Sequence, residues 1–361
     1  MQRLVSLVNS AYIGSKLNHD DVPLDESFIV LLEQFAGSGG SLMRYLQRSS
    51  YADKVKHIVV ADADPCIRAL WQAWADDALR AAMVALIEEM QREAIAPLAV
   101  AFQSYFKADW LPLKSIEWLL LQAKLLKYCK NFTKEKHNQG RIQTPDLLWQ
   151  WWKVWRSQYD SIISNESAYN TEFKAAFGVV FRWLAQSSIV RTSGSGANNS
   201  ALGWQERLEK TCNKVYQSPY LPTGCKVAVF DDWATATAYA ATLRGRKLAI
   251  SDPPYWQPSD GIKLNPSYHY HAPHSDSEFW MAVNSVTQAR RVCDRVVAYN
   301  YRSPALEQAF ADSWAVEDLG ILARIGCGTG LEGGSNHQGQ GNEYCWSWQK
   351  PRQLSLLEVA A

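Results

Sequence analysis

The chain has 361 residues, of which 47% are hydrophobic and 20% charged, and its formal net charge is +1. This composition supports a sizeable core and excludes a globally disordered chain, and the length suits one large α/β domain with an insertion, or two domains. A nucleic-acid enzyme with so little net charge would need a local basic face.

The seven cysteines are scattered, odd in number and contain no Cys-x-x-Cys pair. This favours reduced buried thiols over a zinc site or a secreted disulfide framework. No long apolar run precedes the acidic residues Asp20 and Asp21, and no segment approaches the length of a membrane span. We expect a soluble, cytoplasmic protein with no membrane partner and no metal.

The first part of the chain predicts a strand, a glycine turn, a helix and a second strand. Residues 28–33 form the first buried apolar run, the glycines follow at 37–40, and residues 42–46 are helical in pattern. Residues 55–61 predict the second strand, which Asp62 closes, and Pro65 is placed to begin a helix. This order is half of a nucleotide-binding α/β unit.

Residues from about 66 to 190 show long amphipathic helical patterns, for example at 79–90, 116–128 and 147–155. Strand patterns resume at 226–230, 247–250 and 295–299, and residues 344–348 predict a last strand after a glycine-rich stretch at 326–341. We therefore predict an α/β domain with a mixed, mainly parallel sheet and helices on both faces, interrupted by a helical insertion.

The most informative segment is Ser251-Asp252-Pro253-Pro254-Tyr255-Trp256, directly after the apolar run at 247–250. Two prolines cannot continue a ladder, so a rigid extended loop must follow the strand, where open α/β sheets bind ligands. Asp252 and the proline carbonyls offer acceptors, and Tyr255 offers a flat face. This combination suits a planar molecule with an exocyclic amine, such as a nucleobase. An ordinary surface turn is the less favoured alternative.

The glycines of Phe35-Ala36-Gly37-Ser38-Gly39 let the backbone turn sharply and let a ligand approach the peptide groups. The spacing is not that of a phosphate-binding G-x-G-x-x-G loop, and a plain strand-to-helix turn explains it about as well. Asp62 could accept hydrogen bonds from a ribose diol. Its alternative role is a helix N-cap, shared with Asp64.

In this order the motifs resemble those of the Dam-like, adenine-specific DNA N6-methyltransferases in which the recognition insert precedes D-P-P-Y, and the resemblance covers nearly the whole chain. Residues 12–16 resemble the family's aromatic-x-G-x-K element, residues 35–39 its F-x-G-x-G loop, residues 61–64 its A-D-x-N element and residues 232–233 its D-F pair. Residues 191–203 resemble its R-x-N-x-x-G-x-x-N-x-P-x-G segment, with Ser193 and Ala201 as departures.

The resemblance implies a Rossmann-like S-adenosylmethionine-dependent methyltransferase fold with a helical inserted recognition domain. The catalytic domain would comprise residues 1–95, with the cofactor loop, and residues 211–361, with the D-P-P-Y motif. The helical insertion for DNA recognition would comprise residues 96–210.

The implied cofactor is S-adenosylmethionine. The implied cofactor-binding residues are Tyr12, Lys16 (near the carboxylate), Phe35, Gly37 and Gly39 (under the methionine part), Asp62 (at the ribose), Asp232 and Trp233 (at the adenine), and Asp252. The implied catalytic residues are Asp252, Pro253, Pro254 and Tyr255: Asp252 and the Pro253 carbonyl would accept from the target amine, and Tyr255 would stack on the flipped base.

Nucleic-acid contacts are expected at four residues. Arg191 and Asn199 belong to the 191–203 segment. Lys130 and Lys134 belong to a basic run at 124–141, which a solvated helix face explains equally well.

The expected reaction is methyl transfer to the N6 amine of adenine in DNA with base flipping, as in a site-specific DNA methyltransferase. An aromatic amine is a poor nucleophile because its lone pair is delocalised, and acceptors on its hydrogens make the nitrogen more pyramidal. Positioning and electrostatics then suffice, without a metal. The alternatives are N4-methylation of cytosine and a catalytically silent DNA-binding protein on the same fold. The sequence leaves open the target sequence, the oligomeric state and a partner restriction endonuclease.

Overall fold

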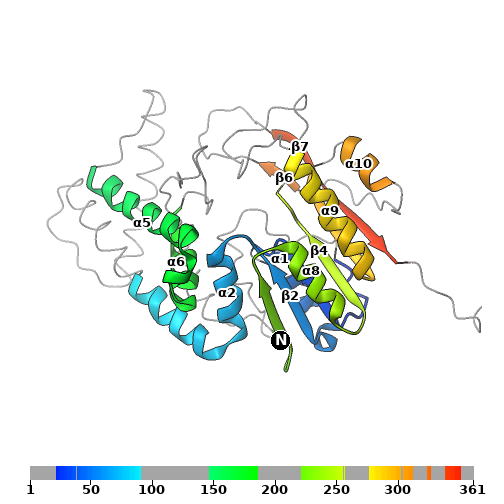
Figure 1. Ribbon diagram of the computed structural model, residues 1–361, viewed down its shortest axis with the longest axis horizontal. Coiled ribbons are helices and arrows are strands. Elements are labelled where there is room, and N and C mark those ends of the chain that lie inside the picture. Colours follow the sequence, from blue (N-terminus) through cyan, green and yellow to red (C-terminus); the bar gives the residue numbers. More distant parts are fainter. Residues whose placement is uncertain are drawn as a thin grey trace, which may run out of the picture.

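The computed structural model describes residues 22–37, 39–90, 146–185, 221–254, 256, 276–301, 304–311, 323–326 and 338–350. Figure 1 shows a twisted sheet with helices packed on it, and a second group of helices beside it. Tyr12, Lys16, Lys130, Lys134, Arg191, Asn199 and Tyr255 lie outside the described residues.

The sheet has seven strands in the order β3-β2-β1-β4-β5-β7-β6. The first five pair in parallel, and β7 runs antiparallel to both β5 and β6. The expected mixed, mainly parallel sheet is therefore confirmed, and it is compatible with a Rossmann-like fold. The strands are β1 (Val30–Glu33), β2 (His57–Ala61), β3 (Lys226–Phe230), β4 (Lys247–Ser251), β5 (Arg295–Tyr301), β6 (Ala323–Gly326) and β7 (Gln338–Gln349).

Helices cover both faces of the sheet because its central strands are apolar on both sides. Leu31 faces a core that α1 and α2 complete, whereas Val30 and Leu32 face a second core under α8 and α9. The helices are α1 (Gly40–Arg48), α2 (Pro65–Ala75), α5 (Asp146–Ser164), α6 (Thr171–Leu184), α8 (Trp233–Thr242), α9 (Asp276–Val292) and α10 (Pro304–Ala311), with short 3-10 turns at Ala52–Lys54 (η1) and Glu166–Ala168 (η2). Residues 77–90 are also helical.

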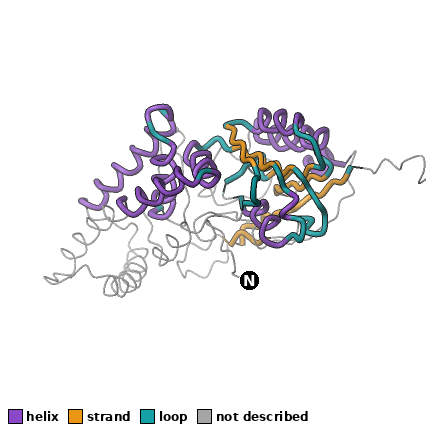
Figure 2. Tube along the Cα trace, turned by 90° about the horizontal axis from the view of Figure 1, so that it is seen from below, coloured by secondary structure: helices purple, strands orange, loops and turns teal. Residues whose placement is uncertain are grey.

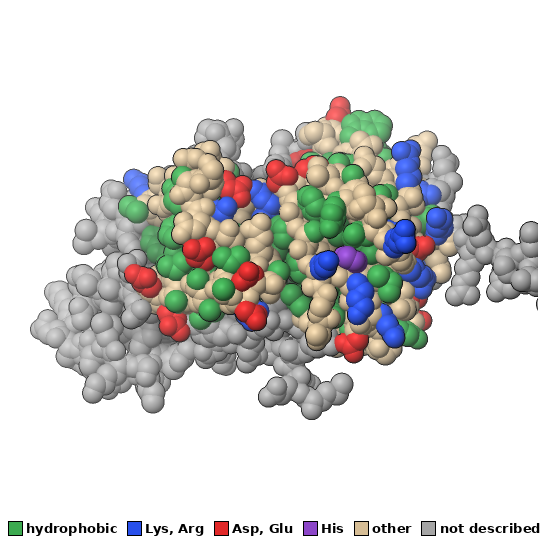
Figure 3. Space-filling view, turned by 60° about the horizontal axis from the view of Figure 1, so that its bottom comes forward, with side chains coloured by type: hydrophobic (Ala, Val, Ile, Leu, Met, Phe, Trp, Pro, Cys, Tyr) green, Lys and Arg blue, Asp and Glu red, His purple; other side chains and the backbone are tan. Residues whose placement is uncertain are grey.

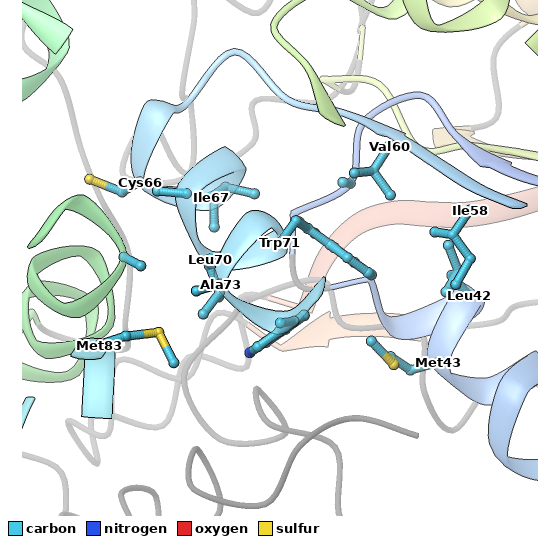
Figure 4. Packing of buried hydrophobic residues seen from close by; sticks show 14 of the residues in the cluster. Leu42, Met43, Ile58, Val60, Cys66, Ile67, Leu70, Trp71, Ala73 and Met83 are labelled. Atoms are coloured by element: carbon cyan, nitrogen blue, oxygen red, sulfur yellow. The ribbon is translucent and has the colours of Figure 1, made fainter. Parts of the chain in front are cut away.

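Trp71 of α2 anchors the first core. Its side chain is buried and lies among residues of α1, α2 and β2, including Leu42 and Val60 (Figure 4). Trp71 also packs edge-on against Trp74, with ring centroids 4.9 Å apart. The α2 helix thereby joins the sheet to the helical group, because its other side contacts α6.

Aromatic stacking holds α5 and α6 together. Trp152 and Tyr159 of α5 stack on Phe181 of α6 at centroid separations of 5.0 and 4.7 Å, and Trp155 stacks on Phe177 at 5.1 Å. Trp152 and Trp155 thus help to pack α5 against α6, two helices that Figure 2 shows in the helical group beside the sheet. The helix predicted at 147–155 is confirmed and continues to Ser164.

Several strand predictions were wrong in extent: for example, the second strand begins at His57 and not at residue 55, and β5 continues to Tyr301 beyond the predicted 295–299. The last strand begins at Gln338, inside the glycine-rich stretch, and β6 was not predicted at all. Residues 343–349 of β7 pair with β5, and the glycine-containing part before them pairs with β6, from Gln338 opposite Gly326 to Asn342 opposite Arg324. Pairing with β6 thus overrides the low strand propensity of glycine. The first strand begins at Val30 instead of Phe28, which is buried by packing against Tyr45 ahead of the strand. No helix in the described ranges is both long and apolar enough to cross a membrane.

Candidate functional site

The candidate site lies where the order of the parallel strands reverses. β1 is paired with β2 on one side and with β4 on the other, so the connections that follow β1 and β4 leave in opposite directions. In open α/β sheets, ligands bind outside the carboxyl ends of the strands at such a point. Here Glu33 is in register with Ile250, which brings the residues after β1 and β4 to the same place.

The glycine turn after β1 is held in a conformation that requires glycine. Gly37 has φ 44° and Gly39 has φ 66°, both in the left-handed region. A Cβ atom on Gly39 would lie 2.3 Å from Cζ2 of Trp71, so side-chain volume is excluded there as well. The Ala36 amide donates to the Ala61 carbonyl over 2.7 Å, which fixes the turn against the end of β2.

Asp62, the first residue after β2, binds the glycine turn through its carboxylate. Oδ2 accepts from the Gly37 amide and Oδ1 from the Asp64 amide, both over 2.8 Å. The cap of α2 is Asp64, whose Oδ1 accepts from the Cys66 amide at 2.8 Å. The two aspartates are thus separated in role: Asp64 caps the helix, and Asp62 faces the turn.

The pKa of Asp62 is raised to about 6. Burial is the largest cause, and the negative charge of Asp64 adds to it. The amide hydrogen bonds from Asp64 and Gly37 and the charge of Arg182 oppose the shift without cancelling it. Asp62 therefore sits in a low-dielectric environment, in which a hydrogen-bond donor from a ligand would be strongly favoured.

Glu33, the last residue of β1, is a site residue that the sequence patterns did not single out. Its side chain is only 3% exposed, and its pKa is raised by burial first and then by the charges of Asp252 and Asp62. Its Oε2 has no hydrogen-bond partner among the described residues. An acid that ends an otherwise apolar buried strand was the signal that could have identified it.

Asp252 follows β4 directly and is half-buried, and the Pro253 that follows it is buried. The loop is fixed further along, where the Trp256 amide donates to Oδ1 of Asn300 over 3.1 Å. Asn300 lies one residue beyond the strand predicted at 295–299, and it is buried in β5, which continues to Tyr301. The D-P-P segment is thus at the carboxyl end of a central strand, as its sequence predicts.

Asp232 and Trp233 stand at the carboxyl end of β3, where α8 begins. Asp232 caps α8, because its Oδ2 accepts from the amide and hydroxyl of Thr235 at 2.7 and 2.8 Å. Burial alone would raise its pKa, but these hydrogen bonds outweigh burial and lower it. The Trp233 ring lies 6.5 Å from that of Phe35, centroid to centroid, so the two aromatic residues border the turn together.

A buried polar group fixes the floor of the site. Gln34 donates from Nε2 to the Thr237 hydroxyl (2.8 Å) and to the Ser285 carbonyl (3.1 Å). The hydroxyls of Ser251 and Ser285 are 3.1 Å apart. These bonds tie α8 and α9 to the ends of β1 and β4. Sequence reasoning missed Gln34 and Ser285, because their partners are more than 200 residues apart in the chain.

Several of the described basic side chains gather at the amino ends of the strands, the end of the sheet opposite the candidate site. Lys and Arg side chains surround a histidine there (Figure 3). His57 of β2 is in register with Lys226 of β3 on one side and with Val30 of β1 on the other, and Val30 is in register with Lys247 of β4. The four residues form a row across the amino ends of these strands. This face lies away from the strand-end residues of the candidate site, since it is formed by the other ends of the same strands.

The described cysteines are free thiols: Cys66, Cys293 and Cys345 are buried, as predicted, whereas Cys225 is only partly buried. Within the described ranges, no group of three or more His, Cys, Asp or Glu residues is arranged to hold a metal ion. No protein-family model matches the sequence, and no curated protein sequence matches it either.

Proposed function

We propose that the chain is an S-adenosylmethionine-dependent methyltransferase that acts on the exocyclic N6 amine of adenine in DNA. One observation carries the proposal. The Asp252-Pro253-Pro254 segment and the Gly37–Gly39 turn with Asp62 lie at the ends of neighbouring strands on either side of the switch point. This common position supports the proposal that the first segment accepts the target amine and the second binds the nucleoside part of the cofactor.

The described residues fit the cofactor in three respects. Asp62 uses one lone pair of each oxygen for backbone amides, which leaves further lone pairs for ribose hydroxyls. The turn after β1 carries no side chain at Gly37 and allows close approach there. The buried Oε2 of Glu33 would gain a partner from a cationic or hydrogen-donating group.

Trp233 would lie alongside the adenine of the cofactor, Asp232 would accept from the adenine amine, and Phe35 would lie under the methionine part. A carboxylate has about four acceptor positions, so capping α8 does not prevent this second role. When bound, S-adenosylmethionine supplies an electrophilic methyl group on a sulfonium sulfur.

Asp252 and the Pro253 carbonyl would hold the two hydrogens of the target amine. Methyl transfer would form the nitrogen–methyl bond and break the sulfur–methyl bond, leaving a neutral thioether. The Asp252 carboxylate, which would hold one of the amine hydrogens, would take the released proton and pass it to solvent. Acceptors placed in advance stabilise the charge that develops on nitrogen without reorganising. Tyr255 would stack on the flipped base, offsetting part of the few kcal/mol that unstacking costs.

The test is to incubate the purified chain with S-adenosylmethionine and mixed-sequence duplex DNA, then digest the DNA and identify methylated nucleosides by mass spectrometry. N6-methyladenine is the expected product. N4-methylcytosine would contradict the assignment of the base, and cofactor binding without any methylated nucleoside would indicate a catalytically silent binding protein.

The matched variants for this assay are Asp252→Ala and Asp294→Ala. Asp294 adjoins β5 at the opposite edge of the sheet, where it accepts from the Lys247 amide over 2.8 Å. Asp252→Ala should abolish methyl transfer and weaken cofactor binding modestly at most. Asp294→Ala should lower stability and leave turnover of the folded protein unchanged. Near wild-type turnover in Asp252→Ala would remove Asp252 from the mechanism.

A further inference from the structure

The loop of residues 62–64, which contains the proposed ribose ligand Asp62, is held by the helical segment 146–185. Oδ2 of Asp64 accepts hydrogen bonds from the Tyr159 hydroxyl of α5 and from Nη2 of Arg182 in α6. The Arg182 contact is also an ion pair, and its guanidinium donates from Nη1 to the Gly178 carbonyl over 3.2 Å. One carboxylate oxygen thus receives donors from both helices.

A second set of contacts reaches the same loop through its backbone. Nη1 of Arg68 donates to the carbonyls of Asp62 and Ala63, both over 2.8 Å. The guanidinium also forms an ion pair with Glu166, which accepts from Nζ of Lys174 over 3.0 Å. Glu166 lies between α5 and α6, and Lys174 lies on α6. The loop is therefore connected to the helical segment at the Asp64 side chain and at two main-chain carbonyls.

The helical segment is closely seated at this point. Tyr159 is 4% exposed, and the side chain of Arg182 is 8% exposed. Gly178 of α6 faces Cys66 of α2, where an added Cβ would lie 2.5 Å from the Cys66 Cβ. The Asp64–Arg182 pair is consequently shielded from water, and its partners have little freedom to move independently.

These contacts continue to the proposed cofactor site by way of Asp62. The Asp64 amide donates to Oδ1 of Asp62, and Oδ2 of Asp62 receives the Gly37 amide. A displacement of Asp64 would therefore move both an amide that binds Asp62 and the carboxylate that binds the glycine turn. A buried ion pair is weak evidence for stability alone, because desolvation offsets much of its attraction. The Asp64–Arg182 pair is better explained as a contact that fixes the position of the loop of residues 62–64.

We propose that Tyr159 and Arg182 are positioning residues for cofactor binding, through which the seating of α5 and α6 on α2 sets the conformation of Asp62 and Gly37. The inference rests on the proposed function for the identity of the ligand. It goes beyond that function because it makes cofactor affinity depend on the helical segment. By linkage, S-adenosylmethionine would in turn stabilise the seating of that segment.

The alternative is that the pair only adds stability, and a pH profile separates the two. The charged groups that face Asp62 are Asp64, Arg182 and Glu33, and Arg68 donates to its carbonyl. Arg182 lowers the pKa of Asp62, whereas Asp64 raises it. Loss of the Arg182 charge should therefore move the pH midpoint of cofactor binding upward. A purely structural role would lower the melting temperature and leave the midpoint where it is.

The experiment is isothermal titration of S-adenosylmethionine into the full chain between pH 5.5 and 8.5. The variants are Arg182→Met, Arg182→Lys and Tyr159→Phe. The matched control is Arg246→Met, which removes a partly buried ion pair with Glu26 at the amino edge of the sheet. Asp294→Ala is a second control, because it removes a carboxylate hydrogen bond to the Lys247 amide at the opposite end of the sheet.

Arg182→Met should weaken binding about tenfold near pH 7, on the scale of a hydrogen bond to a charged group, and raise the pH midpoint. Tyr159→Phe should weaken binding about three- to tenfold, and Arg182→Lys should recover most of the affinity. Neither control should change affinity or midpoint by more than about twofold while folded. Wild-type affinity and midpoint in folded Arg182→Met would overturn the inference.

Amide hydrogen exchange of Gly37 without ligand keeps this inference separable from the proposed function. Exchange at Gly37 should accelerate about three- to tenfold in Arg182→Met and Tyr159→Phe, and stay unchanged in Arg246→Met. If the wild type does not bind S-adenosylmethionine, the proposed function fails, and the exchange result alone decides the positioning role. Unchanged exchange in Arg182→Met would refute that role, and if this variant does not fold, Tyr159→Phe provides the decisive measurement.

Discussion

The amide of Gly37 donates a 2.8 Å hydrogen bond to Oδ2 of Asp62, which joins the turn after β1 to the end of β2. Because the two strands are neighbours in the sheet, one carboxylate can both shape the glycine turn and face a ligand that lies on it. Removing this carboxylate should therefore affect the turn and the proposed cofactor together.

Asp62→Ala should weaken S-adenosylmethionine binding by about 1.5–3 kcal/mol, the scale of hydrogen bonds to a charged acceptor. Asp62→Asn should lose less, because the amide oxygen still accepts one bond. Asp64→Ala should act only indirectly and have a smaller effect, since that side chain is directed to Cys66, Tyr159 and Arg182. Calorimetry at pH 7.5 measures all three, and a greater sensitivity of Asp64 would reverse the assigned roles.

Glu33→Gln should stabilise the protein at neutral pH. Burial and the charges of Asp252 and Asp62 raise the pKa of Glu33 in the folded state above its value in the unfolded chain. Below the unfolded pKa, near 4.3, the carboxyl is neutral in both states and costs nothing. As pH rises through the folded pKa, ionisation favours the unfolded chain, so this stability is lost.

Thermal denaturation of wild type and Glu33→Gln at pH 4 and pH 7.5 checks this sign. The variants should melt alike at pH 4, and Glu33→Gln should melt higher at pH 7.5. A gain of about 1 kcal/mol would shift the melting temperature by about 2–4 °C. The gain should accompany weaker cofactor binding, as expected for a functional residue that lowers stability. A lower melting temperature for Glu33→Gln at pH 7.5 would show that the ionised carboxyl has a stabilising partner.

Gly39→Ala and Gly224→Ala form a matched pair for the glycine turn. Both positions have positive φ, 66° and 72°, so alanine should cost about 1–2 kcal/mol at either for the backbone alone. A Cβ atom added at Gly39 would also lie 2.3 Å from the Trp71 ring, whereas a Cβ atom added at Gly224 would have no neighbour within 4 Å. Gly39→Ala should therefore lose at least about 1–3 kcal/mol more, the scale of overpacking a core. If urea denaturation shows equal losses of unfolding free energy for the two variants, the Trp71 ring moves aside without an energetic cost.

Arg191→Ala tests the predicted DNA contact, which lies outside the described residues. If Arg191 neutralises one phosphate, the slope of log K against log salt should fall by about one unit, and cofactor affinity should not change. If it reads a base edge, the slope should barely move, and discrimination at one position should fall by about 1–3 kcal/mol. Lys226→Glu, at the amino edge of the sheet, is the control. A larger effect at Lys226 would place the DNA interface on that opposite basic face.

The sequence by itself determined those elements that depend on neighbours in the chain. The strand at 226–230 was predicted with the same bounds as β3. The helix α2 begins with Asp64 as its N-cap and Pro65 in its first turn, the positions that these residue types favour. Two prolines after an apolar run end β4 in the same local way. In each case a propensity or a missing amide acts within a few residues, so the pattern is visible in the sequence.

The tertiary structure alone decided which residues meet. Sheet order brings Glu33 beside Asp252 and Asp62. Asp62 and Asp64 both follow β2 in the sequence, but in the folded structure Asp62 binds the glycine turn and Asp64 caps α2. The extent of β7 and the ion pair between Arg182 and Asp64 were decided in the same way. Gly37 and Asp62 are 25 positions apart in the chain, and Asp64 and Arg182 are 118 apart. The energies of these contacts depend on burial and distance, which local sequence does not specify.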